Sequence, residues 1–219
     1  MQIGTENDVQ GPRPRGRPRS FDEAEVLEAA RDAFWNNGYS ATSLDDLVAA
    51  TGLNRPSLYA AFGDKRAIYL RALQENRAAS VEGIRQRLGG DAPLRQSLLD
   101  FLVEAADSTL AGAEGARGCF VVCTAVTESL RDPQTREVAA GYVVEVDAVF
   151  LERFRRSARE LNAGVEPASA AAVASAVLQS LAVRARTGSD RASLLEVVHA
   201  GVNLICGPKK AARAKRSAA

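Results

Sequence analysis

The chain has few of the residues on which catalytic, metal and disulfide sites depend. It contains one histidine and three cysteines among 219 residues. An odd number of cysteines in a chain of this length does not indicate a disulfide framework, so we expect a reducing compartment, the cytoplasm. No compact ligand spacing joins the cysteines to His199, so neither a metal site nor another cofactor is predicted. A single histidine also makes a set of nucleophile, base and positioning group hard to assemble, and we predict no enzyme.

Long apolar runs are missing as well. Apolar residues make up 46% of the chain, but no stretch approaches the roughly 20 consecutive apolar residues that span a membrane. The first ten residues, MQIGTENDVQ, are polar, and no secretory signal is expected. The sequence therefore predicts a soluble protein with no membrane partner and with enough residues for one or two domains.

The net charge of +1 hides an uneven distribution. Residues 1–66 hold eight basic and ten acidic side chains, and residues 67–206 hold fifteen and seventeen. Residues 207–219 hold five basic side chains and no acidic one, which predicts a flexible basic tail. Residues 1–20 are rich in Pro, Gly and Arg, and we expect a disordered arm. The candidate DNA-binding residues of this arm are Arg15, Arg17 and Arg19.

Residues 43–62, SLDDLVAATGLNRPSLYAAF, predict two short helices joined by a tight turn. Ser43 is a good N-cap for the first helix, and Gly52 can adopt the left-handed conformation that ends it. Asn54 caps the second helix, and Pro56 lies in its first turn, where no amide hydrogen is required. Two helices joined by a short turn with a glycine are typical of the DNA-binding helix-turn-helix.

Hydrophobic spacing predicts helices for most of the remaining chain. Residues 118–122 also fit a buried strand, but we favour a helix from 118 to 130 because no partner strand is nearby. The predicted fold is all-α, with a three-helix head at 21–66 that contains the helix-turn-helix, followed by a helical ligand-binding and dimerisation domain at 67–206. The expected helices outside the motif are 21–37, 65–87, 94–110, 118–130, 132–161, 167–187 and 190–206.

The segment from Phe21 to Arg66, roughly a fifth of the chain, resembles the DNA-binding head of TetR-type (tetracycline-repressor family) transcriptional regulators. Ala60 and Ala61 stand where similar proteins often carry histidine or another polar side chain, which leaves fewer groups for reading bases. The resemblance implies a dimeric, sequence-specific repressor that a small-molecule ligand releases from its operator. The matching residues are Ala30, Phe34, Gly38-Tyr39, Thr42, Gly52-Leu53, Leu58-Tyr59, Phe62 and Lys65.

The resemblance also implies roles in binding double-stranded DNA. Thr42, Tyr59 and Lys65 would contact phosphates. Arg55, Pro56 and Ser57, which follow the cap Asn54, would face the major groove.

Alternatives remain open for several of these residues. Arg55 suits bidentate pairing with guanine, but it also suits a phosphate clamp or a solvated arginine. Tyr59 also fits a core aromatic, and Lys65 a surface lysine. The arginines of the arm fit a narrow A·T-rich minor groove or a generic basic leader.

The last two predicted helices would form a four-helix interface in a homodimer, and the alternative is an intramolecular core. The middle helices would enclose a pocket for an apolar small-molecule effector, as in similar proteins. Each candidate lining residue, taken singly, also fits plain core packing. The candidates are Phe101, Ala105, Val122, Cys123, Val126, Tyr142 and Val146.

Cys119 lies at the expected start of a helix, close in sequence to Arg117. A helix dipole and a nearby cation lower the pKa of a thiol, so Cys119 is a candidate redox or electrophile sensor. A small buried thiol is the alternative. A different function for the whole chain would be an architectural nucleic-acid-binding protein without sequence preference, which would use the basic arm and tail.

Overall fold

The structure, a computed structural model, describes residues 21–112 and 115–208. Every regular element in those ranges is helical, which confirms the all-α prediction. Arg15, Arg17, Arg19 and the basic tail from 209 lie outside the described residues. The elements are α1 (Glu23–Asn37), α2 (Leu44–Thr51), α3 (Arg55–Phe62), α4 (Lys65–Leu88), α5 (Leu94–Leu110), a π-helix (Val121–Ala125), α6 (Val126–Glu128), α7 (Pro133–Arg156), a 3₁₀-helix (Ala158–Glu160), α8 (Pro167–Arg186) and α9 (Arg191–Cys206).

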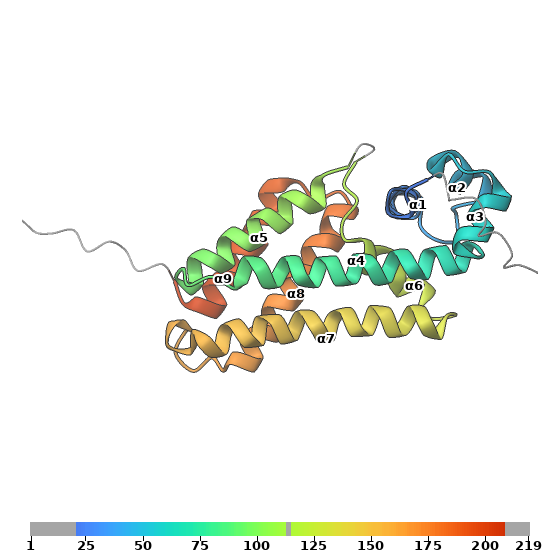
Figure 1. Cartoon of the computed structure of the whole chain (residues 1–219). Coiled ribbons are helices and arrows are strands. Elements are labelled where there is room, and N and C mark those ends of the chain that lie inside the picture. The colour runs from blue at the N-terminus through green and yellow to red at the C-terminus, as the bar shows by residue number, and fades with distance from the viewer. Residues whose placement is uncertain (1–20, 113–114, 209–219) are drawn as a thin grey trace, which may run out of the picture.

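The head is formed by α1, α2 and α3, which lie together at one end of the molecule (Figure 1). A side chain caps each N-terminus, because Asp22, Ser43 and Asn54 accept hydrogen bonds from backbone amides of the first turn. Asp46 completes a capping box by accepting from the backbone amide of Ser43. Gly52 ends α2 with φ 68°, the left-handed conformation that its sequence position predicts.

The core of the head holds the three helices against one another and against α4. Phe34 of α1 and Leu47 of α2 have no exposed surface, and Leu58 of α3 is 1% exposed. The ring of Phe34 meets Tyr69 of α4 edge to face, with the centroids 5.1 Å apart. Helix α4 therefore belongs to both halves of the fold, since it begins under the head and runs the length of the molecule (Figure 1).

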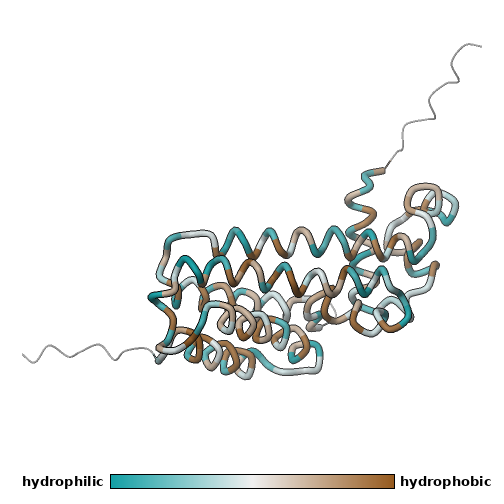
Figure 2. Tube along the Cα trace, turned by 90° about the horizontal axis from the view of Figure 1, so that it is seen from below, coloured by the Kyte–Doolittle hydropathy of each residue, from teal (hydrophilic) through white to brown (hydrophobic). Residues whose placement is uncertain are grey.

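The remaining helices form the regulatory domain, with α4 and α7 side by side as its two longest members and with α5, α8 and α9 packed against one another (Figure 1). Hydrophobic positions recur about once per turn along these helices (Figure 2), as amphipathic helices require. Asp64, Asp132 and Asp190 cap the N-termini of α4, α7 and α9.

Helix α8 is apolar enough, by length and composition, to meet a test for membrane-spanning helices, with a mean hydropathy of 1.3. It packs instead against α7, α9 and α5. Only 39% of its apolar window is buried within the chain. Part of an apolar helix is therefore left uncovered by this single chain.

The predicted helix at 118–130 is wrong in its extent. Gly118 approaches α8 so closely that an added Cβ would lie 2.6 Å from the Ala182 carbonyl oxygen, and the chain becomes helical only at Phe120. Five residues of π-helix follow, and then the three-residue α6. Thr124 and Ser129 hydroxyls donate to carbonyls four residues back, a competition that disturbs a regular helix.

The predicted helix at 132–161 also ends early, at Arg156. Arg153, which is 5% exposed, donates a 2.7 Å hydrogen bond to Ser157 Oγ and another to the Ala92 carbonyl oxygen. A 3₁₀-helix then replaces the expected last turn. The other predicted helix boundaries agree with the structure to within two residues.

Candidate nucleic-acid interface and cavity

Helix α3 presents a short exposed face. Leu58 and Phe62 anchor it in the core of the head, while Asn54, Arg55, Pro56, Tyr59 and Ala60 are exposed and Ser57 is half-buried. Tyr59 is 40% exposed, which excludes the alternative of a core aromatic. A helix with one buried stripe and an exposed first turn has the geometry with which helix-turn-helix proteins enter the major groove.

Arg55 already has a partner on the neighbouring helix. Its Nη2 atom donates a 2.5 Å hydrogen bond to Asp45 of α2, and both side chains are more than half exposed. The Asp45 carboxylate raises the pKa of the Arg55 guanidinium. Contact of Arg55 with a base or a phosphate would therefore require exchange of this carboxylate for the nucleic acid.

Thr42 is buried, and this contradicts its predicted contact with phosphate. The side chain is 1% exposed, and Oγ1 donates a 2.7 Å hydrogen bond to the Gly38 carbonyl oxygen. The hydroxyl thus closes the connection between α1 and α2, and no surface is left for a phosphate.

Lys65 is half-buried at the start of α4, with Nζ 4.5 Å from the centroid of the Tyr39 ring. This cation–π contact positions the ammonium group beside the head. Among the candidate DNA-binding residues in the described part of the chain, the structure thus brings Asn54, Arg55, Pro56, Ser57, Tyr59 and Lys65 to the head, and it buries only Thr42.

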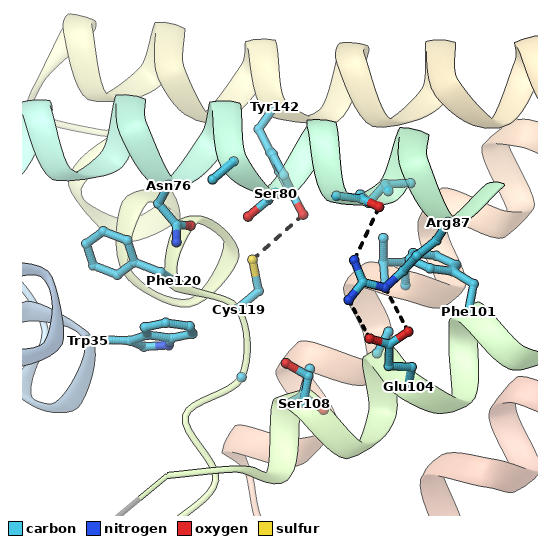
Figure 3. Close-up of a pocket in the computed structure, with 17 residues that line it drawn as sticks. Trp35, Asn76, Ser80, Arg87, Phe101, Glu104, Ser108, Cys119, Phe120 and Tyr142 are labelled. Atoms are coloured by element: carbon cyan, nitrogen blue, oxygen red, sulfur yellow. Dashed lines mark hydrogen bonds and ion pairs between the residues drawn. The ribbon is translucent and has the colours of Figure 1, made fainter. Parts of the chain in front are cut away.

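A cavity of about 250 Å³, partly open to solvent, lies where the head meets the regulatory domain (Figure 3). Its walls come from α1, α4, α5, the segment at 118–120, α7 and α8. Rings and aliphatic side chains make most of the surface, with a few polar groups between them. The lining residues used below are Trp35, Asn76, Ser80, Phe101, Phe120 and Tyr142.

Three of the seven predicted ligand-binding residues line this cavity, namely Phe101, Ala105 and Tyr142. Val126 is 60% exposed and Val146 is fully buried, and neither reaches the cavity. Val122 and Cys123 also lie outside its walls. For Val122, Cys123 and Val126 the π-helix explains the difference, because its wider turn rotates the side chains after Phe120 away from the positions that a regular helix would give them. Val146 lies on α7 and fills the core.

Cys119 lines the cavity, but the prediction that its thiol pKa is lowered is wrong. Burial raises the pKa of the thiol, and this outweighs the hydrogen bonds that would favour the thiolate. Arg117 does not help, since it stacks over the Trp35 ring and forms a 3.3 Å ion pair with Asp32. Cys119 is therefore a neutral, half-buried thiol beside Tyr142, with 3.8 Å between Sγ and Oη.

Sequence reasoning missed Trp35, the side chain through which the head reaches the cavity. Its indole Nε1 donates a 3.0 Å hydrogen bond to the Arg117 carbonyl oxygen. A large apolar residue directly after Phe34, and so off the stripe that packs the head, was the available signal for a second contact face on α1.

Arg186 of α8 joins the same junction. Its Nη1 atom donates to the carbonyl oxygens of Trp35 at 2.7 Å and Arg117 at 3.0 Å, and Nη2 donates to that of Asn36 at 3.3 Å. The last carbonyls of a helix have no partner within the helix, so Arg186 satisfies the C-terminus of α1 from the regulatory domain.

A cluster of aromatic rings continues this junction beneath the head. Phe120 meets Trp35 at 5.7 Å and Tyr69 at 6.0 Å between ring centroids. Tyr69 in turn contacts Tyr39 at 4.6 Å, and its hydroxyl bonds to Thr124 of the π-helix at 2.9 Å. Side chains that line the cavity are therefore in direct contact with the core of the head.

Comparison with known proteins agrees with this geometry. Residues 26–72 match the family model for bacterial regulatory proteins of the tetR family. The HTH-type transcriptional repressor BdcR of Escherichia coli (strain K12) is 32% identical over 143 residues, which cover 64% of this chain and 70% of that protein. The HTH-type transcriptional regulator YezE of Bacillus subtilis (strain 168) is 31% identical over 54% of this chain and 61%, less than two thirds, of its own length.

A solved structure matches over more of the chain. The TetR family transcriptional regulator CifR, solved as a cysteine mutant in complex with 26 bp double-strand operator DNA, is 32% identical with a TM-score of 0.75. The match covers 85% of this chain and 98% of that chain. The prediction of a helix-turn-helix transcriptional regulator is thus confirmed. The chain belongs to the tetR family of bacterial regulatory proteins.

Proposed function

We propose that the chain is a homodimeric repressor that binds a specific operator through its head and leaves it when a small molecule occupies the cavity. One observation carries this proposal: Trp35, a residue of the head, forms part of the wall of a cavity built mainly by the regulatory domain. A ligand in the cavity would therefore contact the head directly.

The homodimer would form through α8 and α9. Both helices expose apolar side chains, with Val183 of α8 50% exposed and Leu204 of α9 65% exposed. A two-fold dimer would place its two copies of α3 about one turn of DNA apart, about 34–36 Å. One helix-turn-helix reads too few base pairs for specificity, so this pairing supports operator recognition.

On the operator, Tyr59 and Lys65 would contact phosphates, and Arg55 would exchange Asp45 for guanine or phosphate. Arg15, Arg17 and Arg19 would enter a neighbouring minor groove. Because phosphate contacts release counterions, the affinity should fall steeply as the salt concentration rises.

Release from the operator would follow from movement of α1. A ligand that fits one arrangement of Trp35 and Phe120 better than another stabilises that arrangement. Because both residues contact the aromatic cluster beneath the head, the ligand would change the position of the head in each subunit. A loss of DNA affinity of about 5- to 150-fold needs only about 1–3 kcal/mol of coupling.

The relatives are transcriptional regulators, and we infer that this chain likewise works in the cytoplasm and catalyses no reaction. The single histidine, His199, is exposed on α9, far along the chain from the cavity cysteine. A thiol reagent that alkylates Cys119 without turnover of any substrate would agree with this inference.

Selection of binding sites from random duplex DNA tests the proposal. We expect a palindrome with half-sites spaced for a two-fold dimer. Tyr59→Ala and Lys65→Ala should abolish most of the binding, and deletion of residues 1–19 should weaken it less. The opposite pattern, with no enriched palindrome and loss on deletion of the arm, would favour the architectural alternative.

The oligomeric state is tested with two exposed leucines. Leu204→Glu should give a monomer by sedimentation and abolish operator binding, because it places charge on the proposed interface. Leu130→Glu, at a position 82% exposed between α6 and α7, should leave the dimer intact. Dissociation by Leu130→Glu alone would locate the interface elsewhere.

A further inference from the structure

Tyr142 has a hydrogen-bonding capacity that the cavity leaves unused. The residue is 5% exposed, and its hydroxyl points across the cavity (Figure 3). Within the described residues its hydrogen-bond partner is Cys119 Sγ, 3.8 Å away. Sulfur is a weak donor and a weak acceptor. The buried phenol hydrogen therefore has no oxygen or nitrogen acceptor within the described part of the chain.

Two polar side chains of α4 reach the cavity from the same side. Asn76 and Ser80 are one helical turn apart, and both point into the cavity (Figure 3). Figure 3 marks no hydrogen bond from either side chain to another of the lining residues drawn. Polar groups that converge on an otherwise apolar cavity are the groups that orient a ligand.

The charged groups of the cavity are already paired. Arg87 and Glu104 form a two-point ion pair at the wall, with Arg87 Nε 2.7 Å from Glu104 Oε2. Burial raises the pKa of the Tyr142 phenol and of the Cys119 thiol, so both are neutral at physiological pH. An ionised ligand against the apolar walls would lose part of its hydration without meeting an unpaired opposite charge among the described lining residues, which is unfavourable.

We propose that the effector is an uncharged compound with a carbonyl or similar oxygen that accepts a hydrogen bond from Tyr142. Its apolar body packs against Trp35, Phe120 and Phe101. This inference rests on the proposed function, because it names the class of ligand for the same cavity. Asn76 and Ser80 select among such compounds by their second polar group.

Three probes of the same size class test the inference by calorimetric titration of the full chain: acetophenone, ethylbenzene and benzoate. Acetophenone should bind most tightly and benzoate least. Tyr142→Phe should weaken the binding of acetophenone about 3- to 10-fold, the loss expected for one hydrogen bond. It should leave the affinity for ethylbenzene unchanged. Ser108→Ala, which removes a hydroxyl from another wall, should change neither.

Equal affinities for acetophenone and ethylbenzene, preference for benzoate, or no binding of acetophenone at millimolar concentration would each overturn the inference. The ranking in the unsubstituted protein decides the question even if Tyr142→Phe does not fold. Operator binding by the same preparation separates this result from the proposed function. A protein that binds an operator but prefers benzoate disproves only the ligand class, whereas one that binds no specific DNA disproves the proposed function.

Discussion

The head and its junction with the regulatory domain use hydrogen bonds of very different range along the chain. In the head, Asp22, Ser43 and Asn54 each cap a helix through an amide two or three residues away. Where the regulatory domain meets the head, Trp35 donates a hydrogen bond to Arg117, 82 positions away. Arg186 donates one to Trp35, 151 positions away. The head is thus defined locally, whereas the junction exists only when the whole chain has folded.

This difference separates two tasks. The head has only to present α3, and short caps with one small core suffice for a rigid unit. The regulatory domain has to register a ligand and pass the change on, and this needs contacts that span both domains. Trp35 belongs to both tasks, since it lies on α1 and lines the cavity. Substitutions in the two regions should therefore have separable effects.

The largest effect is expected where the segment at 118–120 approaches α8 closely. Gly118 has φ +67°, and an added Cβ would lie 2.6 Å from the Ala182 carbonyl oxygen and 2.7 Å from Cys123 Sγ. We expect Gly118→Ala to lower the free energy of unfolding by about 2–4 kcal/mol, from backbone strain and overpacking together.

Chemical denaturation measures this loss, and Gly164→Ala is the matched control. Gly164 has φ +77° but nothing within 4 Å of an added Cβ, so only the backbone strain is present. Equal losses for the two variants would show that the contact with α8 contributes nothing.

The next effect tests the junction itself. Arg186→Met removes the donors that satisfy the carbonyl oxygens of Trp35, Asn36 and Arg117. We expect a loss of about 1–3 kcal/mol and altered emission of Trp35, the single tryptophan of the chain. Fluorescence-monitored denaturation records both quantities.

Arg184→Met is the control for this prediction, because Arg184 is exposed and bonds only a serine of its own helix. It should change stability by less than about 0.5 kcal/mol. Similar losses for both arginines would mean that α1 does not depend on α8.

Substitutions of Tyr59 and Tyr69 test DNA binding and stability separately. Tyr59→Phe should weaken operator binding about 3- to 10-fold by removing one hydrogen bond to phosphate, without a change in stability. Tyr69→Phe should instead lower stability by about 1 kcal/mol, because it removes the buried bond to Thr124. Titration of operator DNA and thermal unfolding of each variant check this. If both substitutions weakened DNA binding to the same degree, the head and the regulatory domain would not have separable effects.

The smallest effect is expected at the ion pair that joins α4 to the N-terminus of α7. Arg66 donates to both oxygens of Asp132, at 2.7 and 2.9 Å, and lowers the pKa of Asp132 from 3.8 to about 2. A lowered pKa in the folded state stabilises the protein above pH 3.8, and this contribution is lost as the pH falls towards 2.

Because the pair lies at the surface, with Arg66 45% and Asp132 19% exposed, we expect at most about 1 kcal/mol. Unfolding measured between pH 5 and pH 2 should lose less stability in Asp132→Asn than in the unsubstituted protein. Identical pH profiles would show that the carboxylate does not stabilise the fold.

The helix boundaries could be predicted because caps and glycines act through adjacent residues. Ser43, Gly52 and Asn54 have the roles in the structure that their positions in the sequence predict. The segment at 118–130 could not be predicted in the same way. There Gly118 approaches α8, a contact between residues more than 60 positions apart, and the π-helix begins three residues later.

The cavity was only partly predictable for a similar reason. Apolar periodicity marks Phe101 and Tyr142 as inward-facing, but it does not distinguish a side chain that lines a cavity from one that fills the core, as Val146 does. Thr42 is a further example, since a threonine after a turn suits a phosphate contact and a buried bond to Gly38 equally well.

The sequence by itself determined the helical class, the helix-turn-helix and its exposed face, and the family, because these depend on spacing and capping within a few residues. Only the tertiary structure decided that Trp35 and Arg186 join the head to the regulatory domain and that Cys119 is a neutral thiol beside Tyr142. Those properties come from burial and from partners brought together by folding, and no local pattern encodes either one.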